Sequence, residues 1–124
     1  MFFMTWAHKD GEPSIGQNYA TMQQQIDGAY LAIAHELQVP VAPVGFTWYM
    51  VSHDHPEIVL WQADGIHPAA AGTYLAACVF YASIFRQSPA GLPFHGGVSD
   101  DQARLLQDEA GAHVLDMESE WGLR

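Results

Sequence analysis

The sequence predicts a protein of the α/β class, and three observations lead to this prediction. Two short and almost continuously apolar runs, Phe2 to Trp6 and Val41 to Val44, are typical of strands that are covered on both faces in a parallel sheet. The segment between them has helical periodicity. A strand, a helix and a second strand in this order imply a right-handed crossover that joins parallel neighbours.

The segment that joins the two strands divides into a loop and a helix. His8 to Gln17 is polar and contains glycines and a proline, which predicts a loop. Asn18 is the expected N-cap of the helix. Pro40 ends the helix, because the residue before a proline is pushed towards extended geometry. Between these limits, apolar side chains recur at steps of three and four on one helical face: Tyr19, Met22, Ile26, Tyr30, Ile33 and Leu37.

The chain after the second strand is expected to be mostly helical. Gly45 allows a sharp exit from the strand, and Phe46 to Val51 favours a short helix. A polar loop is predicted for Ser52 to Pro56. Pro68 suits the first position of a long apolar helix that continues to about Phe85.

The last third of the chain predicts a loop followed by a final helix. Glycines and prolines mark residues 87 to 98 as the loop. Ser99 and Gln102 fit a capping-box pair at the start of the helix, and the residues from about Glu118 to Arg124 are expected to fray. The apolar stripe of this helix consists of Ala103, Leu106, Ala110, Val114 and Met117.

The charge balance is strongly acidic, with a formal net charge of -10 at pH 7. Strong bases occur only at Lys9, Arg86, Arg104 and Arg124. Nucleic acid is therefore not an expected partner, because neutralising its phosphates needs clustered cations, and docking on anionic membranes is disfavoured for the same reason. The longest uncharged run, residues 68 to 85, predicts a buried helix rather than a membrane span.

Two further features limit what the sequence says about the compartment. Cys78 is the single cysteine, so no internal disulfide is possible, and its apolar surroundings predict a buried and inert thiol. No basic region precedes the first apolar residues, so no signal peptide is expected. The sequence therefore does not predict in which cellular compartment the protein lies.

The segment that points most directly to chemistry is Asp64-Gly65-Ile66-His67-Pro68. An aspartate three residues before a histidine, on a turn that opens a helix, can accept the Nδ1 proton of the imidazole and leave Nε2 free to act as a base. Gly65 permits the tight turn, and the nearby helix N-terminus disfavours the imidazolium form. The spacing alone is also typical of a helix cap or a solvated turn.

The same segment resembles the Asp-x-x-His block with which SGNH/GDSL-type serine hydrolases close their catalytic triad. The segment Met4-Thr5-Trp6-Ala7, with Lys9-Asp10-Gly11 after it, resembles the fourth strand and exit loop of one bacterial branch. Val41-Ala42-Pro43-Val44-Gly45 resembles the fifth strand, and the segment from Gly72 to Cys78 resembles the helix after the catalytic block. The resemblance covers roughly residues 1 to 110.

The resemblance implies the C-terminal portion of a flavodoxin-like three-layer α/β/α sandwich with a parallel sheet. It also implies hydrolysis of a small ester, such as an acylated carbohydrate or a lipid, without cofactor or metal. His67 would be general base and then general acid, and Asp64 would orient it. Trp6 and Trp61 would lie near the carboxyl ends of the strands, where they either line an acyl or alcohol pocket or pack in the core.

The departures from the family are equally informative. The family's nucleophile is a serine in a Gly-Asp-Ser block, and no serine of this chain has that context. Its oxyanion donors include a glycine and an asparagine from other blocks, whereas the only asparagine here, Asn18, is predicted to cap a helix. Residues 1 to 124 are therefore expected to form a single partial domain that is inactive alone. Such a chain would self-associate or pair with a missing N-terminal half.

Two other functions remain open on the sequence alone. The first is a non-catalytic binding or interaction module that derives from a hydrolase. The second is a metal-binding protein that uses His53-Asp54-His55, with His8 and Asp10 elsewhere in the chain. Adjacent ligands in a loop are geometrically awkward, because consecutive side chains diverge.

Overall fold

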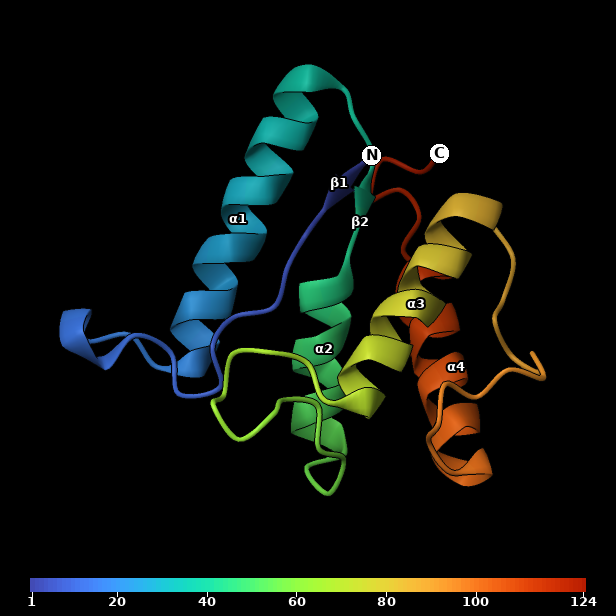
Figure 1. The fold of residues 1–124 in the computed structure, drawn as a ribbon. Helices are drawn as coiled ribbons and strands as arrows, with labels where there is room; N and C mark the ends of the chain where they lie inside the picture. The colour runs from blue at the N-terminus through green and yellow to red at the C-terminus, as the bar shows by residue number, and fades with distance from the viewer.

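Two short parallel strands lie between one long helix on one side and a pair of helices on the other (Figure 1). The computed structural model describes residues 1 to 124. It is an α/β structure that is mostly helical. Its elements, in chain order, are β1 (Phe2–Phe3), the 3-10 turn η1 (Pro13–Ile15), α1 (Tyr19–Leu37), β2 (Val41–Ala42), α2 (Val44–Asp54), α3 (Ala70–Phe85) and α4 (Asp100–Leu115).

The two strands are parallel, as predicted, but each is only two residues long. Phe2 pairs with Val41, and the Phe2 and Met4 amides donate to the carbonyls of Pro40 and Ala42 at 2.8 and 3.1 Å. The sheet has no third strand. The prediction of an α/β protein with parallel strands is therefore confirmed, but the structure does not contain three layers around an extended sheet.

The second strand ends earlier than predicted because Val44 already belongs to α2. The Thr47 amide and hydroxyl both donate to the Pro43 carbonyl at 3.0 Å, which closes the first helical turn. A short buried apolar run is compatible with either a strand or a buried helix, so the prediction of a strand up to Val44 was wrong. The predicted helix over Phe46 to Val51 is confirmed, although it continues to Asp54 and shortens the predicted loop.

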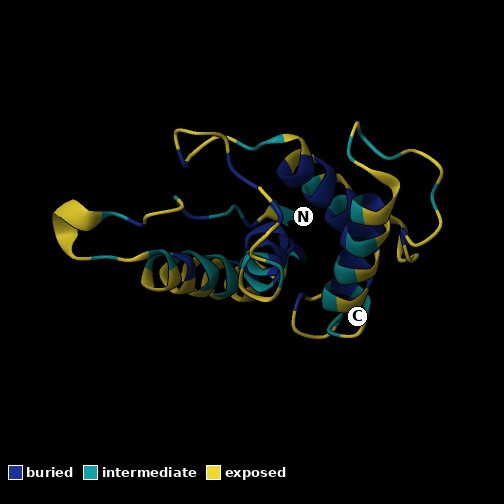
Figure 2. Ribbon diagram, turned by 90° about the horizontal axis from the view of Figure 1, so that it is seen from below, coloured by how far each residue is buried: buried dark blue, intermediate teal, exposed yellow.

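Helix α1 begins at the predicted cap. The Asn18 side chain accepts from the Thr21 amide at 2.9 Å, and the Thr21 hydroxyl accepts from the Asn18 amide in return. The predicted apolar face is only partly correct, since Ile33 and Leu37 are exposed. Figure 2 shows that α1 is mostly exposed or half-buried along its length, whereas much of α2 and α3 is buried.

A buried glutamine that the periodicity does not reveal joins α1 to the chain after β1. The Gln23 side chain accepts from the Ala7 amide at 2.7 Å and donates to the Thr5 carbonyl at 3.2 Å. It also donates to the Asp27 carboxylate at 2.7 Å, while burial raises the pKa of that carboxyl group. Because each polar atom of Gln23 has a partner, its amide can be buried at little cost.

The hydrophobic core lies between α2, α3, α4 and the strands. Helix α4 has one half of the predicted capping box, in which the Ser99 hydroxyl accepts from the Gln102 amide, but the Gln102 side chain does not bond back to Ser99. Four residues of its predicted stripe are buried. Helix α3 begins at Ala70, two residues after the predicted start. Cys78 is buried on α3, as predicted, and burial raises the pKa of its thiol to about 11. No helix combines the length and the apolar character needed to cross a membrane.

The C-terminal residues are packed rather than frayed, so the prediction of a frayed tail from Glu118 was wrong. Trp121 is 3% exposed and Leu123 is also buried. The Val41 amide donates to the Trp121 carbonyl at 2.9 Å, and the Trp121 indole donates to the His113 carbonyl at 2.8 Å. The tail therefore occupies the edge of β2 that does not face β1.

Candidate active site

The Asp64–His67 turn lies in a closed loop between α2 and α3. The Gln62 amide donates to the His67 carbonyl at 2.8 Å, and an antiparallel bridge pairs Trp61 with Pro68. Gly65 has a φ of 68°, in the left-handed region where glycine avoids the steric cost of a side chain. A Cβ atom at Gly65 would also lie only 3.3 Å from the Lys9 Cβ. The predicted role of Gly65 in a tight turn is thus confirmed.

The Asp64 carboxylate uses both oxygens within this turn. Its Oδ1 accepts from the Ile66 and His67 amides at 2.9 and 3.0 Å, and its Oδ2 lies 2.5 Å from the His67 Nδ1. The hydrogen bond from His67, together with those from the two amides, lowers the pKa of Asp64 to about 2. A carboxylate can only accept, so Nδ1 carries a proton, and in the neutral ring the lone pair is therefore on Nε2.

The His67 ring is open to solvent on its Nε2 side. Its side chain is 68% exposed, and Nε2 makes no hydrogen bond in the structure. The serines before the turn are engaged elsewhere: the Ser14 hydroxyl donates to Glu12 at 2.5 Å and the Ser52 hydroxyl to the Tyr49 carbonyl at 2.9 Å. The structure thus contains an oriented acid–base pair and no serine bonded to it.

Trp6 and Trp61 both contact the segments that surround the turn, although the sequence does not reveal how. The Trp6 indole N–H donates to the Ile66 carbonyl at 2.9 Å, and the Trp61 indole N–H donates to the Ala7 carbonyl at 3.1 Å. Trp61 is buried and lines a cavity of about 310 Å³ together with Lys9, Tyr19 and Ser52. Trp6 is half-buried. Its side chain lies against the turn, and its ring is stacked on Trp48.

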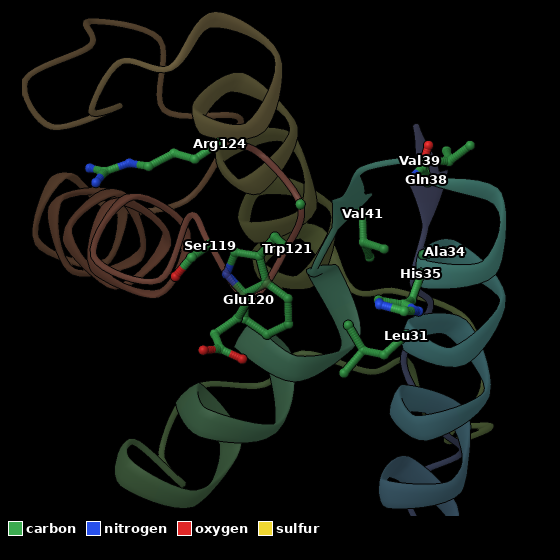
Figure 3. Close-up of a pocket in the computed structure, with 11 residues that line it drawn as sticks. Leu31, Ala34, His35, Gln38, Val39, Val41, Ser119, Glu120, Trp121 and Arg124 are labelled. Carbon is green, nitrogen blue, oxygen red and sulfur yellow. The ribbon is translucent and has the colours of Figure 1, made fainter.

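A second cavity, of about 360 Å³, lies away from this turn (Figure 3). It is bordered by the C-terminal half of α1, the start of β2 and the C-terminal tail. Leu31 and His35 of α1 face Trp121 across it. Because neither Asp64 nor His67 lines it, this cavity does not form part of the candidate active site.

The histidines of the proposed metal loop point to different partners. His53 and Asp54 belong to the last turn of α2 and contact each other at 2.9 Å. His55 instead contacts Glu109 of α4 at 3.4 Å, and His113 contacts the same carboxylate at 3.1 Å. No group of three or more histidine, cysteine, aspartate or glutamate side chains is arranged to hold a metal ion. The geometry of this loop therefore does not favour the metal-binding alternative.

Comparisons with protein-family models, with curated proteins and with solved structures each find no match to this chain.

Proposed function

We propose that this chain supplies the acid–base half of an SGNH/GDSL-type serine ester hydrolase. The observation that carries the proposal is the Asp64–His67 pair, in which one carboxylate binds Nδ1 at 2.5 Å and two backbone amides at 2.9 and 3.0 Å. This arrangement places the ring proton of the neutral imidazole on Nδ1 and leaves Nε2 open to solvent. It is the state that a general base needs before it removes a proton from a serine hydroxyl.

The reaction would be ester hydrolysis through an acyl-serine intermediate. The serine and the oxyanion donors would come from a polypeptide segment outside residues 1 to 124. His67 Nε2 would take the serine proton as the hydroxyl attacks the ester carbonyl, and would then give that proton to the departing alcohol. Water would release the acid in the second half of the cycle, with His67 again as base. Asp64 would stabilise the imidazolium in both halves.

The complete protein would be a flavodoxin-like three-layer sandwich in which β1 and β2 belong to a larger parallel sheet. Its substrate would be a small ester, such as an acylated carbohydrate or a lipid. The cavity of about 310 Å³ beside Trp61 is lined by neither Asp64 nor His67, so the substrate class rests on the family resemblance and not on this cavity. Two hydroxyl groups line it, from Tyr19 and Ser52, and they lie 3.5 Å apart.

The first test measures turnover of p-nitrophenyl acetate. The chain alone should hydrolyse this ester no faster than free imidazole does, and its rate should not saturate with substrate, because no serine is bonded to His67. The same chain joined to a segment with an in-frame Gly-Asp-Ser block, sought upstream of Met1 in the source DNA, should be active. A completed polypeptide without esterase activity would contradict the proposal. Turnover by the chain alone that a serine-directed phosphonate abolishes would instead point to Ser14 or Ser52.

A non-catalytic interaction module is the second candidate, and the lack of any serine in a Gly-Asp-Ser context favours it. A related proposal concerns β1, which is paired on one edge only. The Phe2 and Met4 amides point to β2, so the Phe3 amide points to the other edge. Phe3 itself is 41% exposed, with its ring beside Phe80. An apolar strand edge of this kind is a template for pairing with another chain.

We therefore expect the isolated chain to self-associate through the open edge of β1 or to pair with an N-terminal half. Size-exclusion chromatography with light scattering measures the mass, and a thermal melt measures the cooperativity of unfolding. A mass above 13.7 kDa that falls when Phe3 is replaced by lysine supports association through this edge. A monomer with a sharp transition would contradict it and favour the interaction module.

A further inference from the structure

We propose that Trp6 is a positioning residue whose indole N–H sets the orientation and the tautomer of His67. The role in catalysis rests on the proposed hydrolase function, whereas the effect on the histidine ring does not. Trp6 follows β1, and His67 lies in the loop between α2 and α3, so the contact joins segments that are 60 residues apart. No local turn geometry requires it.

The contact acts on the peptide group that carries His67. The Trp6 N–H donates to the Ile66 carbonyl at 2.9 Å, and the N–H of the same peptide group, on His67, donates to Asp64 Oδ1 at 3.0 Å. One peptide plane is thus held at both ends, and its rotation would break both bonds. A donor to the carbonyl also polarises the peptide, which makes the His67 N–H a stronger donor to the carboxylate.

The chain of hydrogen bonds continues from the carboxylate to the ring. Asp64 Oδ2 lies 2.5 Å from the His67 Nδ1. The order is therefore Trp6 indole, Ile66–His67 peptide, Asp64 carboxylate, His67 imidazole. Each bond fixes the orientation of the group that makes the next one, so loss of the first donor loosens the carboxylate that selects the Nδ1–H tautomer.

The Trp6 indole is itself held rigidly. It stacks on Trp48 with ring centroids 4.3 Å apart and an angle of 11° between the planes. Trp48 is fully buried and meets Trp61 edge to face at 5.5 Å. Trp61 also connects back to the segment that carries Trp6, because its N–H donates to the carbonyl of Ala7, the next residue. The three rings form a tryptophan cluster, defined as Trp6, Trp48 and Trp61. This cluster contacts the Asp64–His67 turn through the Trp6 N–H.

Within the tryptophan cluster, Trp48 provides a matched control for Trp6. The Trp48 indole nitrogen is buried and has no hydrogen-bond partner, whereas those of Trp6 and Trp61 both donate. Trp48→Phe removes ring volume from the fully buried core but no hydrogen bond, and it keeps an aromatic ring on which Trp6 can stack. Trp6→Phe removes a smaller amount of buried volume, because Trp6 is only half-buried, together with the donor to Ile66. A purely structural role predicts a larger effect of Trp48→Phe on the turn, and a positioning role predicts the reverse.

The experiment is NMR of the full chain with ¹⁵N-labelled histidine, near pH 7.5. In the wild type, the His67 shifts should report the Nδ1–H tautomer, with a downfield Nδ1 proton. Trp6→Phe should shift the ring to a mixture of the two neutral tautomers and remove the downfield proton, while Trp48→Phe should leave both signals in place. Unchanged His67 signals in Trp6→Phe would overturn the proposal, as would an equal change in Trp48→Phe.

A second replacement keeps the test decisive if Trp6→Phe unfolds. An indole analogue in which sulfur replaces the N–H group, β-(3-benzothienyl)alanine at position 6, retains the ring stack and removes only the donor. It should reproduce the tautomer change, and a wild-type spectrum would overturn the proposal. Since the readout involves no ester, a lack of turnover in the completed polypeptide would contradict the hydrolase function and leave this result standing.

Discussion

Replacement of His67 by alanine should lower kcat for ester hydrolysis on the order of 10³-fold or more in the proposed completed enzyme, the effect expected if His67 acts as the histidine of a triad. The reason is that, in the proposed mechanism, Nε2 takes the serine proton and returns it to the leaving alcohol. KM should change far less, because the imidazole acts in the transition state. Steady-state kinetics with p-nitrophenyl acetate measures both constants.

Two controls separate this effect from a general loss of charge or fold. Asp64→Asn should cost less than His67→Ala, because the carboxylate orients the base and does not transfer the proton. His95 offers a matched control, since its Nδ1 also contacts a carboxylate, Asp100, at 2.7 Å. His95→Ala should leave kcat unchanged. A wild-type rate in His67→Ala would remove the basis of the site assignment.

Replacement of Gly45 by alanine should abolish cooperative folding or nearly so. A Cβ atom at this position would lie 1.9 Å from the Thr5 carbonyl oxygen and 2.5 Å from the Gln23 side-chain nitrogen. The backbone after β1 would have to move, which would break the 2.8 Å bond from the Gly45 amide to Met4 and the contacts of Gln23. We expect a loss of more than about 4 kcal/mol, a large part of the roughly 5 to 15 kcal/mol that stabilises a typical domain.

Urea and thermal unfolding, followed by circular dichroism, measure this loss. Gly28→Ala is the matched control, because Gly28 lies within α1 and a Cβ there would meet no atom within 4 Å. It should raise the stability by about 0.5 to 1 kcal/mol, through the higher helix propensity of alanine. If the urea midpoint of Gly45→Ala equalled that of the wild type, the close approach of α2 to the segment after β1 would be disproved.

The features predicted correctly are those that depend on neighbouring residues. The Asn18 and Ser99 caps each join residues three positions apart, as does the Asp64–His67 contact. Gly45 shows the limit of such reasoning. Its predicted purpose was a sharp exit from the strand, whereas in the structure it has no positive φ and is required by the Thr5 backbone, 40 residues away in the sequence.

The features that were missed depend on long-range contacts. Trp6 and Trp61 were considered as pocket or core residues. Trp61 is buried and lines a cavity, but the sequence does not reveal that the two indole N–H groups bind carbonyls 60 and 54 residues away. Trp121 was placed in a frayed tail because nothing near it in the sequence indicates a partner, yet its backbone pairs with Val41. The strand lengths were overestimated for a similar reason, since a run of apolar residues does not reveal where a neighbouring strand stops.

The pairing of Trp121 with β2 also affects the order of events during synthesis. Both edges of β2 are filled, one by β1 and the other by a segment about 80 residues further along the chain. While the ribosome is still adding the last helix, Val41 lacks its partner and the core face that Trp121 covers is open to water. Folding of this domain can therefore be completed only after residue 121 has left the exit tunnel, and until then the apolar core face is exposed in the way that makes folding intermediates prone to aggregation.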